Sequence, residues 1–237
     1  MISKEEIFEV KHAGAMLKGG FSRFEHQMRR NTDTASFSRL YAKLPKSASN
    51  IYYRDQIGNI STSDLYFEAD KTAFEISTRF PIFGGWQTNF YIGYSIPTQS
   101  ALFFESDTNR YKLKIDFFTI FEDVWVEELE IKVILPEGCN NVQVKVPYLH
   151  EKSNGVRYTY LDSELNGGRP VITIKAKNAV EEHDKQIEIF YSFNKYRMLV
   201  EPAILVSCFF FFFVFCSIIS RLESNVGGKK FFSNKEA

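Results

Sequence analysis

The sequence predicts a mainly β protein: an antiparallel β-sandwich-like domain followed by a single transmembrane α-helix. Two observations support this prediction. Over most of the chain apolar and polar residues alternate, and turn-forming residues interrupt the alternation at short intervals. Near the C-terminus, residues 202–220 form the uncharged run PAILVSCFFFFFVFCSIIS. The first pattern is typical of strands with one buried face, and the second of a helix in lipid.

The alternation begins at Ser36 and continues to Phe193. In TAFEISTRF, Phe74, Ile76 and Phe80 share one face, and polar residues occupy the other. Further stretches of this kind are YKLKIDFF, LEIKVIL, VQVKV, VITIKA and QIEIFYSF. Proline, glycine and Asn-Gly turn signals separate them, so we expect many short strands in an antiparallel sandwich. One short helix is predicted around residues 179–185.

Changes in periodicity and hydropathy divide the chain into five expected segments. They are an incomplete N-terminal segment (1–35), a β-rich domain (36–195), a juxtamembrane linker (196–201), a transmembrane helix (202–220) and a short tail (221–237). The first segment is mixed in character, and its opening, MISKEEIFEV, lacks the apolar centre of a signal peptide.

The run at 202–220 is long enough to cross a bilayer. At about 1.5 Å of rise per residue it makes a helix of ~28 Å, close to the ~30 Å hydrocarbon core. A buried helix of a soluble domain is the alternative, but such helices usually carry a polar stripe. Here the mildly polar residues are Ser207, Cys208, Cys216 and Ser217. The run lacks glycine, which excludes a GxxxG helix contact.

Only NKYRMLVE separates the last predicted strand from this run, so we expect the sandwich to lie close to the bilayer. Tyr196 suits the aromatic layer of a membrane interface, and Lys195 and Arg197 suit contacts with headgroups. A solvated linker remains an equal alternative for these three residues.

The composition excludes some classes of partner and bond. Lysine and arginine number 29, aspartate and glutamate also 29, and a formal net charge of zero gives no support to nucleic-acid binding. Of the three cysteines, Cys208 and Cys216 lie in the apolar run. Cys139 is therefore left without a partner in the β-rich part, and no disulfide framework is predicted there.

No arrangement of residues typical of an active site or metal site stands out. The histidines, His12, His26, His150 and His183, lack metal-ligand spacing, and no nucleophile elbow, phosphate loop or dinucleotide fingerprint is present. The acidic residues Glu122, Asp123, Glu127, Glu128 and Glu130 could pair for acid–base chemistry, but a solvated strand edge or loop fits them better. We therefore predict no catalytic, cofactor-binding or metal-binding residue and no cofactor.

One modification signal is present. Asn59-Ile60-Ser61 is an Asn-x-Ser acceptor for N-glycosylation, and no other such tripeptide occurs in the chain. Gly58 precedes it and polar residues follow, which indicates an exposed turn. Asn59 is the predicted glycosylation site if this part of the chain is lumenal.

Several long strings of the chain are not generic to β domains. They are LKGGFSRFEHQ, IYYRDQIGNISTSDLYF, RFPIFGGWQTNFYIGYSIP, VILPEGCNNVQV, YTYLD, GRPVITIKAKNAVEEH and FNKYRMLVEPAIL. In this order, across residues 10–222, they resemble the ribophorin I family, a subunit of the oligosaccharyltransferase complex of the endoplasmic reticulum. The resemblance implies a single-pass glycoprotein of the endoplasmic reticulum membrane, with a lumenal β domain and a cytosolic C-terminus. Asn59 falls where the matching family string carries a sequon.

The resemblance also implies a non-catalytic subunit, which supports the transfer of a dolichol-linked oligosaccharide to Asn-x-Ser/Thr of nascent proteins by assembly and substrate positioning. Catalysis and the divalent metal are expected in a different, multi-spanning subunit. The implied partners are the other subunits, including the catalytic one, nascent polypeptides and membrane lipid. Family members begin with a signal peptide and a further lumenal domain, so this chain is expected to correspond to their C-terminal part.

Two other classes of function stay open. A tail-anchored membrane adaptor with a cytosolic β domain would also have one C-terminal span and no signal peptide. Flanking charge does not separate these topologies, because basic residues lie on both sides of the span. A membrane-anchored hydrolase or transferase has no supporting motif.

Overall fold

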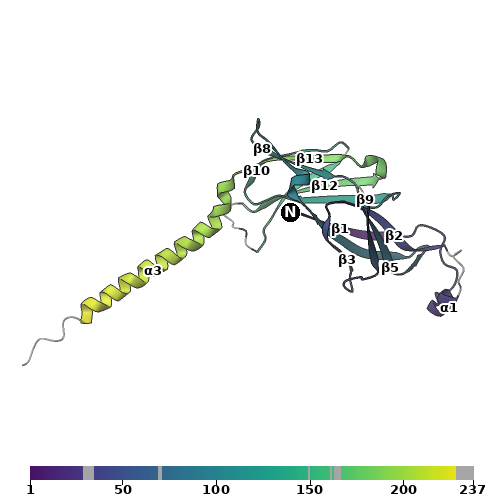
Figure 1. Ribbon diagram of the computed structural model, residues 1–237, viewed down its shortest axis with the longest axis horizontal. Coiled ribbons are helices and arrows are strands. Elements are labelled where there is room, and N and C mark those ends of the chain that lie inside the picture. The colour runs from purple at the N-terminus through teal and green to yellow at the C-terminus, as the bar shows by residue number, and fades with distance from the viewer. Residues whose placement is uncertain (29–34, 69–70, 149, 161, 163–166, 228–237) are drawn as a thin grey trace, which may run out of the picture.

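The computed structural model describes residues 1–28, 35–68, 71–148, 150–160, 162 and 167–227. Four antiparallel β-sheets form a body from which one long helix, α3 (Val200–Gly227), extends (Figure 1). The predicted class, antiparallel β followed by one helix that could span a membrane, is confirmed. Part of the predicted tail, 228–237, lies outside the described residues.

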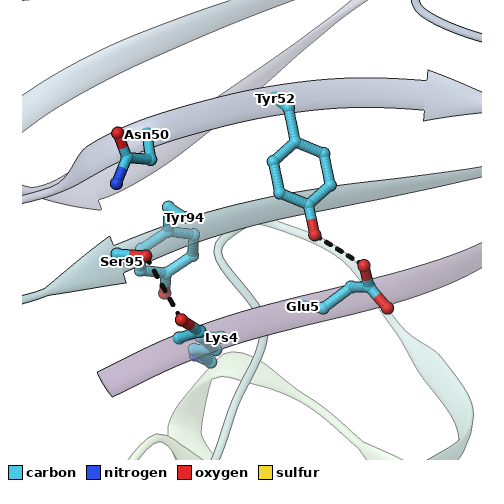
Figure 2. Close-up of a pocket in the computed structure, with 7 residues that line it drawn as sticks. Lys4, Glu5, Asn50, Tyr52, Tyr94 and Ser95 are labelled. Carbon is cyan, nitrogen blue, oxygen red and sulfur yellow. Dashed lines mark hydrogen bonds between the residues drawn. The ribbon is translucent and has the colours of Figure 1, made fainter. Parts of the chain in front are cut away.

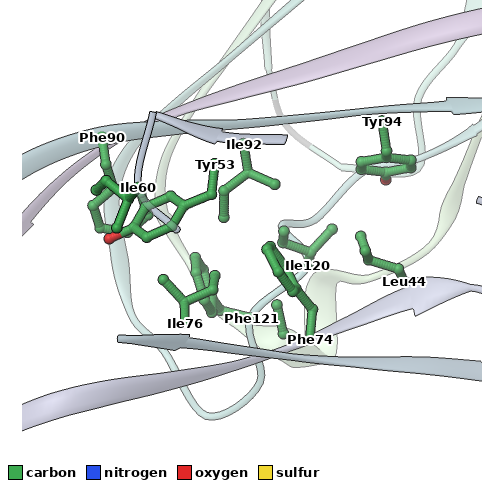
Figure 3. Close-up of a cluster of buried hydrophobic side chains, with 11 residues drawn as sticks. Leu44, Tyr53, Ile60, Phe74, Ile76, Phe90, Ile92, Tyr94, Ile120 and Phe121 are labelled. Atoms are coloured by element: carbon green, nitrogen blue, oxygen red, sulfur yellow. The ribbon is translucent and has the colours of Figure 1, made fainter. Parts of the chain in front are cut away.

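The first two sheets enclose one hydrophobic core. One has the order β1-β6-β3 and the other β2-β5-β4. Their strands are β1 (Ile2–Lys11), β2 (Ser36–Pro45), β3 (Ser49–Asp55), β4 (Ser63–Phe67), β5 (Lys71–Phe83) and β6 (Gln87–Ile96). Figure 3 shows the side chains between them, among which Ile76 and Ile92 are completely buried. Burying one such side chain is worth about 1.5–3 kcal/mol. We call this unit the first sandwich.

The other two sheets enclose a second core, with the orders β10-β13-β8-β7 and β11-β12-β9. Their strands are β7 (Leu102–Glu105), β8 (Arg110–Asp116), β9 (Val126–Ile134), β10 (Cys139–Lys145), β11 (Glu151–Arg157), β12 (Arg169–Ala179) and β13 (Gln186–Phe193). Ile174, Ile187 and Ile189 are completely buried in this core. We call this unit the second sandwich, and in Figure 1 it lies between the first sandwich and α3.

A short helix, α2 (Thr98–Ala101), follows β6 and leads into the second sandwich. The first sandwich carries another, α1 (Arg23–Met28), on the side away from α3 (Figure 1). The buried side chains thus form two clusters, whereas one β-rich domain over 36–195 is expected from the sequence. Period-two patterns predict strands but not which sheets share a core, so this expectation was too coarse.

The segment 1–35 also contains more structure than its sequence indicates. Strand β1 pairs with β6 along its whole length, from Ile2 opposite Ile96 to Lys11 opposite Gln87. Its inward positions include Lys4 and Glu6 as well as apolar residues, and these charges hide the alternation. The first sandwich therefore begins at β1 and not at Ser36.

Two further predictions need correction. The helix expected around 179–185 is only a 3₁₀ turn, η2 (Glu181–His183), which the hydrogen bond from His183 N to Val180 O at 2.9 Å closes, and β12 extends to Ala179 before it. The expected linker 196–201 is helical as well: a 3₁₀ segment, η3 (Lys195–Leu199), continues directly into α3. The helix that includes 202–220 therefore starts before the apolar run and ends after it.

Candidate functional site

Asn59 lies exposed in the connection between β3 and β4. Gly58 before it adopts φ +139°, a backbone conformation that residues with a side chain rarely adopt. Ile60 after it is buried in the first core, and its N–H donates to Tyr53 O at 3.0 Å. The inward Ile60 fixes the turn, so Asn59 and Ser61 on either side of it face solvent. This agrees with the exposed turn predicted for the sequon.

An ion pair holds the start of this connection. Arg79 on β5 donates through Nε to Asp55 Oδ2 and through a second guanidinium nitrogen to Asp55 Oδ1 at 3.0 Å. Asp55 Oδ1 also accepts from the N–H groups of Ile57 (2.9 Å) and Gly58 (3.0 Å). The hydrogen bond from Arg79, with those from the backbone, outweighs burial and lowers the pKa of Asp55. The carboxylate thereby links β5 to the turn of the acceptor.

The Asn59 side chain has one defined contact. Arg54 Nε donates to Asn59 Oδ1 at 2.6 Å, and the Arg54 guanidinium lies 4.7 Å from the centre of the Tyr52 ring. An N-linked glycan is attached to the amide nitrogen, so a contact to the amide oxygen is compatible with glycosylation. The arginine orients the amide while leaving it on the surface.

Acidic residues from Glu122 to Glu130 contact basic side chains and another part of the chain. Glu122 forms an ion pair with Lys43, and Glu130 lies 3.5 Å from Lys175. Asp123 N–H donates to Glu181, in another part of the chain. Among the residues that the structure describes, no group of three or more histidine, cysteine or acidic side chains could hold a metal ion. The observed contacts are those of a solvated strand and loop.

The first sheet carries a polar hollow of about 330 Å³ (Figure 2). Here the Tyr52 hydroxyl donates to Glu5 Oε2 at 2.6 Å, and this hydrogen bond raises the pKa of Tyr52. The Tyr52 ring lies directly over Gly93, where a Cβ atom would overlap it. The hollow is lined by Ser3, Lys4, Glu5, Asn50, Tyr52, Tyr94 and Ser95.

A second hollow, of about 290 Å³, lies where the two sandwiches meet. Its walls carry both signs of charge, with Lys4 and Lys43 from the first sandwich and Asp116 and Asp184 from the second. Burial and the nearby Asp116 raise the pKa of Asp184. The mixed charge gives no preference for an anionic or a cationic ligand.

Beside this hollow, a polar link joins β1 to the connection between β8 and β9. Lys4 Nζ lies 2.9 Å from Glu6 Oε1, while Glu6 Oε2 accepts from Thr119 Oγ1 at 2.9 Å and from Ile120 N at 3.3 Å. Burial opposes the charge of Lys4, but Glu6 and Tyr94 raise its pKa by more, so it exceeds the ordinary lysine value. Sequence analysis missed this link and the pair Asp55–Arg79. In the sequence, Lys4 and Glu6 are visible only as charges at inward positions of a strand, and no pattern marks the pair Asp55–Arg79.

The C-terminal helix has the properties of a membrane span. Residues Lys195–Leu222 are long and apolar enough to cross a bilayer, by length and composition, and the apolar window of this helix is not buried against the body. At its start, Asn194 Oδ1 accepts from Tyr196 N at 3.0 Å, which caps η3. The apolar side chains of the predicted transmembrane helix are therefore exposed, as contact with lipid requires.

Sequence comparison identifies the family. A family model described as Ribophorin I matches residues 1–220. The chain belongs to the ribophorin I family. Among similar proteins are dolichyl-diphosphooligosaccharide–protein glycosyltransferase subunit 1B of rice (Oryza sativa subsp. japonica), 42% identical over 94% of this chain, and subunit 1A of Arabidopsis thaliana, 41% identical over 93%. Subunit 1 of Caenorhabditis elegans is 41% identical over 95% of the chain.

These ribophorin I relatives are longer than the chain. The match covers 46% of the rice protein, 35% of the Arabidopsis protein and 38% of the nematode protein. The chain thus spans less than half the length of these curated relatives. The matched region includes both sandwiches and most of α3.

Proposed function

We propose that this ribophorin I chain is a non-catalytic part of the oligosaccharyltransferase complex. In this role it supports transfer of a dolichol-linked oligosaccharide to Asn-x-Ser/Thr of nascent proteins by assembly and substrate positioning. The match of the family model over residues 1–220 carries the proposal, together with relatives named as subunits of the glycosyltransferase. Catalysis would reside in another subunit, and the partners would be other subunits and nascent chains.

Co-purification from microsomes tests this role. The full chain, carrying an affinity tag and an added signal peptide, should retain the catalytic subunit after mild detergent extraction. The matched control is the same tag on an unrelated single-span protein of the endoplasmic reticulum. Recovery of the chain without any other subunit would contradict the proposal. In cells that lack the endogenous protein, expression should also restore glycosylation of under-glycosylated reporters.

We further propose that both sandwiches are lumenal, that the C-terminus is cytosolic and that Asn59 carries a glycan. The exposed turn around Asn59 supports the site, and the long apolar helix supports the single-pass topology. The competing topology, a tail-anchored adaptor with a cytosolic body, places Asn59 where no oligosaccharide is transferred.

Gel mobility decides between these topologies and provides the first prediction. Asn59→Gln and Ser61→Ala should each remove one glycosidase-sensitive shift, because each destroys the acceptor. Thr62→Ala changes the neighbouring hydroxyl and should keep the shift. If the wild-type body shows no shift even with an added signal peptide and is digested by protease on sealed microsomes, the lumenal topology is wrong.

A further inference from the structure

The directions of the strands bring several turns to the end of the second sandwich where α3 begins. Strand β13 runs toward η3, and Cys139, the first residue of β10, lies opposite Phe193. In the same sheet, Tyr111 near the start of β8 lies opposite Tyr191 near the end of β13. The β7–β8 turn, between Glu105 and its partner Arg110, is therefore at this end too. We call this the juxtamembrane end; it comprises the turns at 106–109 and 136–138, residues 158–160, and η3.

The opposite sheet reaches this end as well. Strand β9 leads through 135–138 into the start of β10, so its last residues lie there. Ile134 near the end of β9 pairs with Val171, close to the start of β12. Arg157, at the end of β11, pairs with Arg169, the first residue of β12. Residues 158–160 therefore leave the sandwich at the end where β9 leads into β10.

Exposed tyrosines are prominent at this end. Tyr160 is 98% exposed, Tyr196 in η3 is 80% exposed, and Tyr158 is 56% exposed. Tyrosine combines an apolar ring with a hydroxyl and is enriched where a membrane meets water. Met198 and Leu199 add exposed apolar surface between Tyr196 and α3. In a headgroup layer the rings and the apolar side chains pack against lipid, while the tyrosine hydroxyls can still form hydrogen bonds.

The body holds this surface firmly. The Phe104 ring lies 5.1 Å from Tyr111, which stacks on Tyr191 at 5.7 Å in the last strand before η3. Arg197 of η3 packs on the 136–138 turn so closely that a Cβ on Gly138 would lie 2.6 Å from its Cδ. Because η3 packs on the second sandwich and continues into α3, the orientation of α3 determines how this end of the sandwich lies relative to the bilayer.

Distance along the chain places this end beside the bilayer. Pro202 follows Tyr196 by six positions, which at about 1.5–2 Å of rise per residue cover ~9–12 Å. The headgroup layer on one side of a bilayer is about 5–8 Å thick. When the apolar run lies in hydrocarbon, the backbone of Tyr196 is therefore at or just beyond the outer boundary of the headgroups, so its side chain can extend into them, and the turns packed beside η3 are close to it.

The charges at this end favour a neutral lipid surface. Within the juxtamembrane end the acidic residues are Asp107 and Glu137, and the basic residues are Lys195 and Arg197. An excess of one sign, which would select anionic lipid, is not found among these residues. The partner that fits is a zwitterionic phospholipid headgroup layer.

From these observations we propose that the juxtamembrane end is a second membrane contact: Tyr158, Tyr160 and Tyr196 insert into the headgroup layer of the bilayer that α3 crosses. The second sandwich is then held at two points, by α3 and by the 158–160 loop. The proposal depends on α3 spanning a membrane and is independent of the role in glycosylation.

Fluorescence quenching of the full chain in phosphatidylcholine vesicles tests the contact. An environment-sensitive dye is attached to Tyr160→Cys after Cys208 and Cys216 are replaced by alanine. The remaining Cys139 is buried, and burial raises its thiol pKa to about 12, so it should not react. Vesicles with and without nitroxide-bearing headgroups are compared. Ile57→Cys, at a position 82% exposed in the turn of Asn59, is the matched control. In a separate sample that keeps Cys208, a dye on this native cysteine reports insertion of α3.

Headgroup nitroxide should lower the emission of the dye at position 160 about twofold and leave the dye at position 57 unchanged, because only the former sits among headgroups. Tyr158→Asp with Tyr196→Asp should reduce the quenching at position 160, whereas Tyr66→Asp on the first sandwich should not. Quenching of the dye on Cys208 by acyl-chain nitroxide shows that α3 is inserted. If headgroup nitroxide then quenches the dyes at positions 160 and 57 equally, the proposal is overturned. The proposal would also be overturned if the dye at position 160 were protected only in an assembled complex, by contact with another protein and without quenching by headgroup nitroxide.

Discussion

At the scale of single residues, the turn of Asn59 depends on a carboxylate. Asp55 receives hydrogen bonds from Arg79, Ile57 and Gly58 and so joins β5 to the acceptor turn. Each of these bonds favours the ionised form, which is why the pKa of Asp55 is lowered. The exposed position of Asn59 is therefore coupled to the protonation of a neighbour.

This coupling predicts a pH dependence. A carboxylate whose folded pKa is lowered adds stability that is complete above its unfolded pKa, about 4, and is lost as the pH falls through the folded pKa. Asp55→Asn should therefore lower the free energy of unfolding at pH 7 and make it fall less between pH 4 and pH 2. Asp64→Asn, on an exposed position of β4, is the control. Parallel acid titration curves for Asp55→Asn and wild type would contradict the prediction.

Another residue-scale constraint is Gly93. The Tyr52 hydroxyl reaches Glu5 (Figure 2). Its ring lies across Gly93, so a methyl group at position 93 must displace the ring. Gly93→Ala should cost about 1–3 kcal/mol of unfolding free energy, the usual price of overpacking. Gly155→Ala, where the added Cβ meets open space, should cost less.

A double-mutant cycle identifies the cause of that loss. In a Tyr52→Ala background the ring is gone, so Gly93→Ala should be nearly neutral in chemical denaturation. Additive losses would show that something other than the Tyr52 contact makes glycine necessary.

At the scale of elements, strand β1 and helix α3 are opposite cases. Strand β1 forms although it carries charge at Lys4 and Glu6 on its inward face, because its ladder with β6 and the Lys4–Glu6 pair compensate. Helix α3 needs no partner in the body and depends on its own apolar composition. Long-range pairing thus determines the first element, and local hydropathy the second.

The dependence of α3 on hydropathy gives a prediction. Phe211→Arg with Phe213→Arg near the middle of the run should abolish membrane integration, because two arginines there cost ~5–7 kcal/mol on insertion scales. The chain should then be released by alkaline carbonate. Phe211→Leu with Phe213→Leu keeps the apolar character and should remain in the pellet. Retention of the arginine variant would mean that another part of the chain anchors it.

At the scale of the whole molecule, the connection after β8 fastens the sandwiches together. Phe117 is buried in the second core, whereas Ile120 and Phe121 are buried in the first. Lys43 N–H donates to Ile120 O at 2.9 Å, and Glu6 accepts from Thr119. A segment that fills both cores makes their unfolding interdependent.

Phe121→Ala tests this interdependence. Phe121 contacts Phe8 at 4.8 Å and Phe90 at 6.3 Å between ring centres, so its truncation should cost about 3–5 kcal/mol. Circular dichroism during denaturation should show a lower midpoint, and limited proteolysis should cut the loosened connection around 117–123. Phe67→Ala, on a side chain that is 78% exposed, is the control. Equal effects of the two variants would exclude a fastening role for Phe121.

The sequence by itself determined the strands whose alternation is clean, the apolar span, the exposed acceptor turn and the family. QIEIFYSF coincides with β13, and Ile187, Ile189 and Tyr191 are buried as its period requires. These properties are local, since periodicity, turn residues and hydropathy act within a few positions of the chain.

Only the tertiary structure decided that there are two cores, that β1 belongs to the first, and that turns far apart in sequence meet beside α3. Glu6 and Thr119, for example, lie 113 residues apart and meet at the junction of the sandwiches. A charged residue on an inward face looks like a break in the strand pattern until its partner is known. The physical reason is that burial of charge is offset by a specific contact, and such contacts are made by the fold and not by neighbours in the chain.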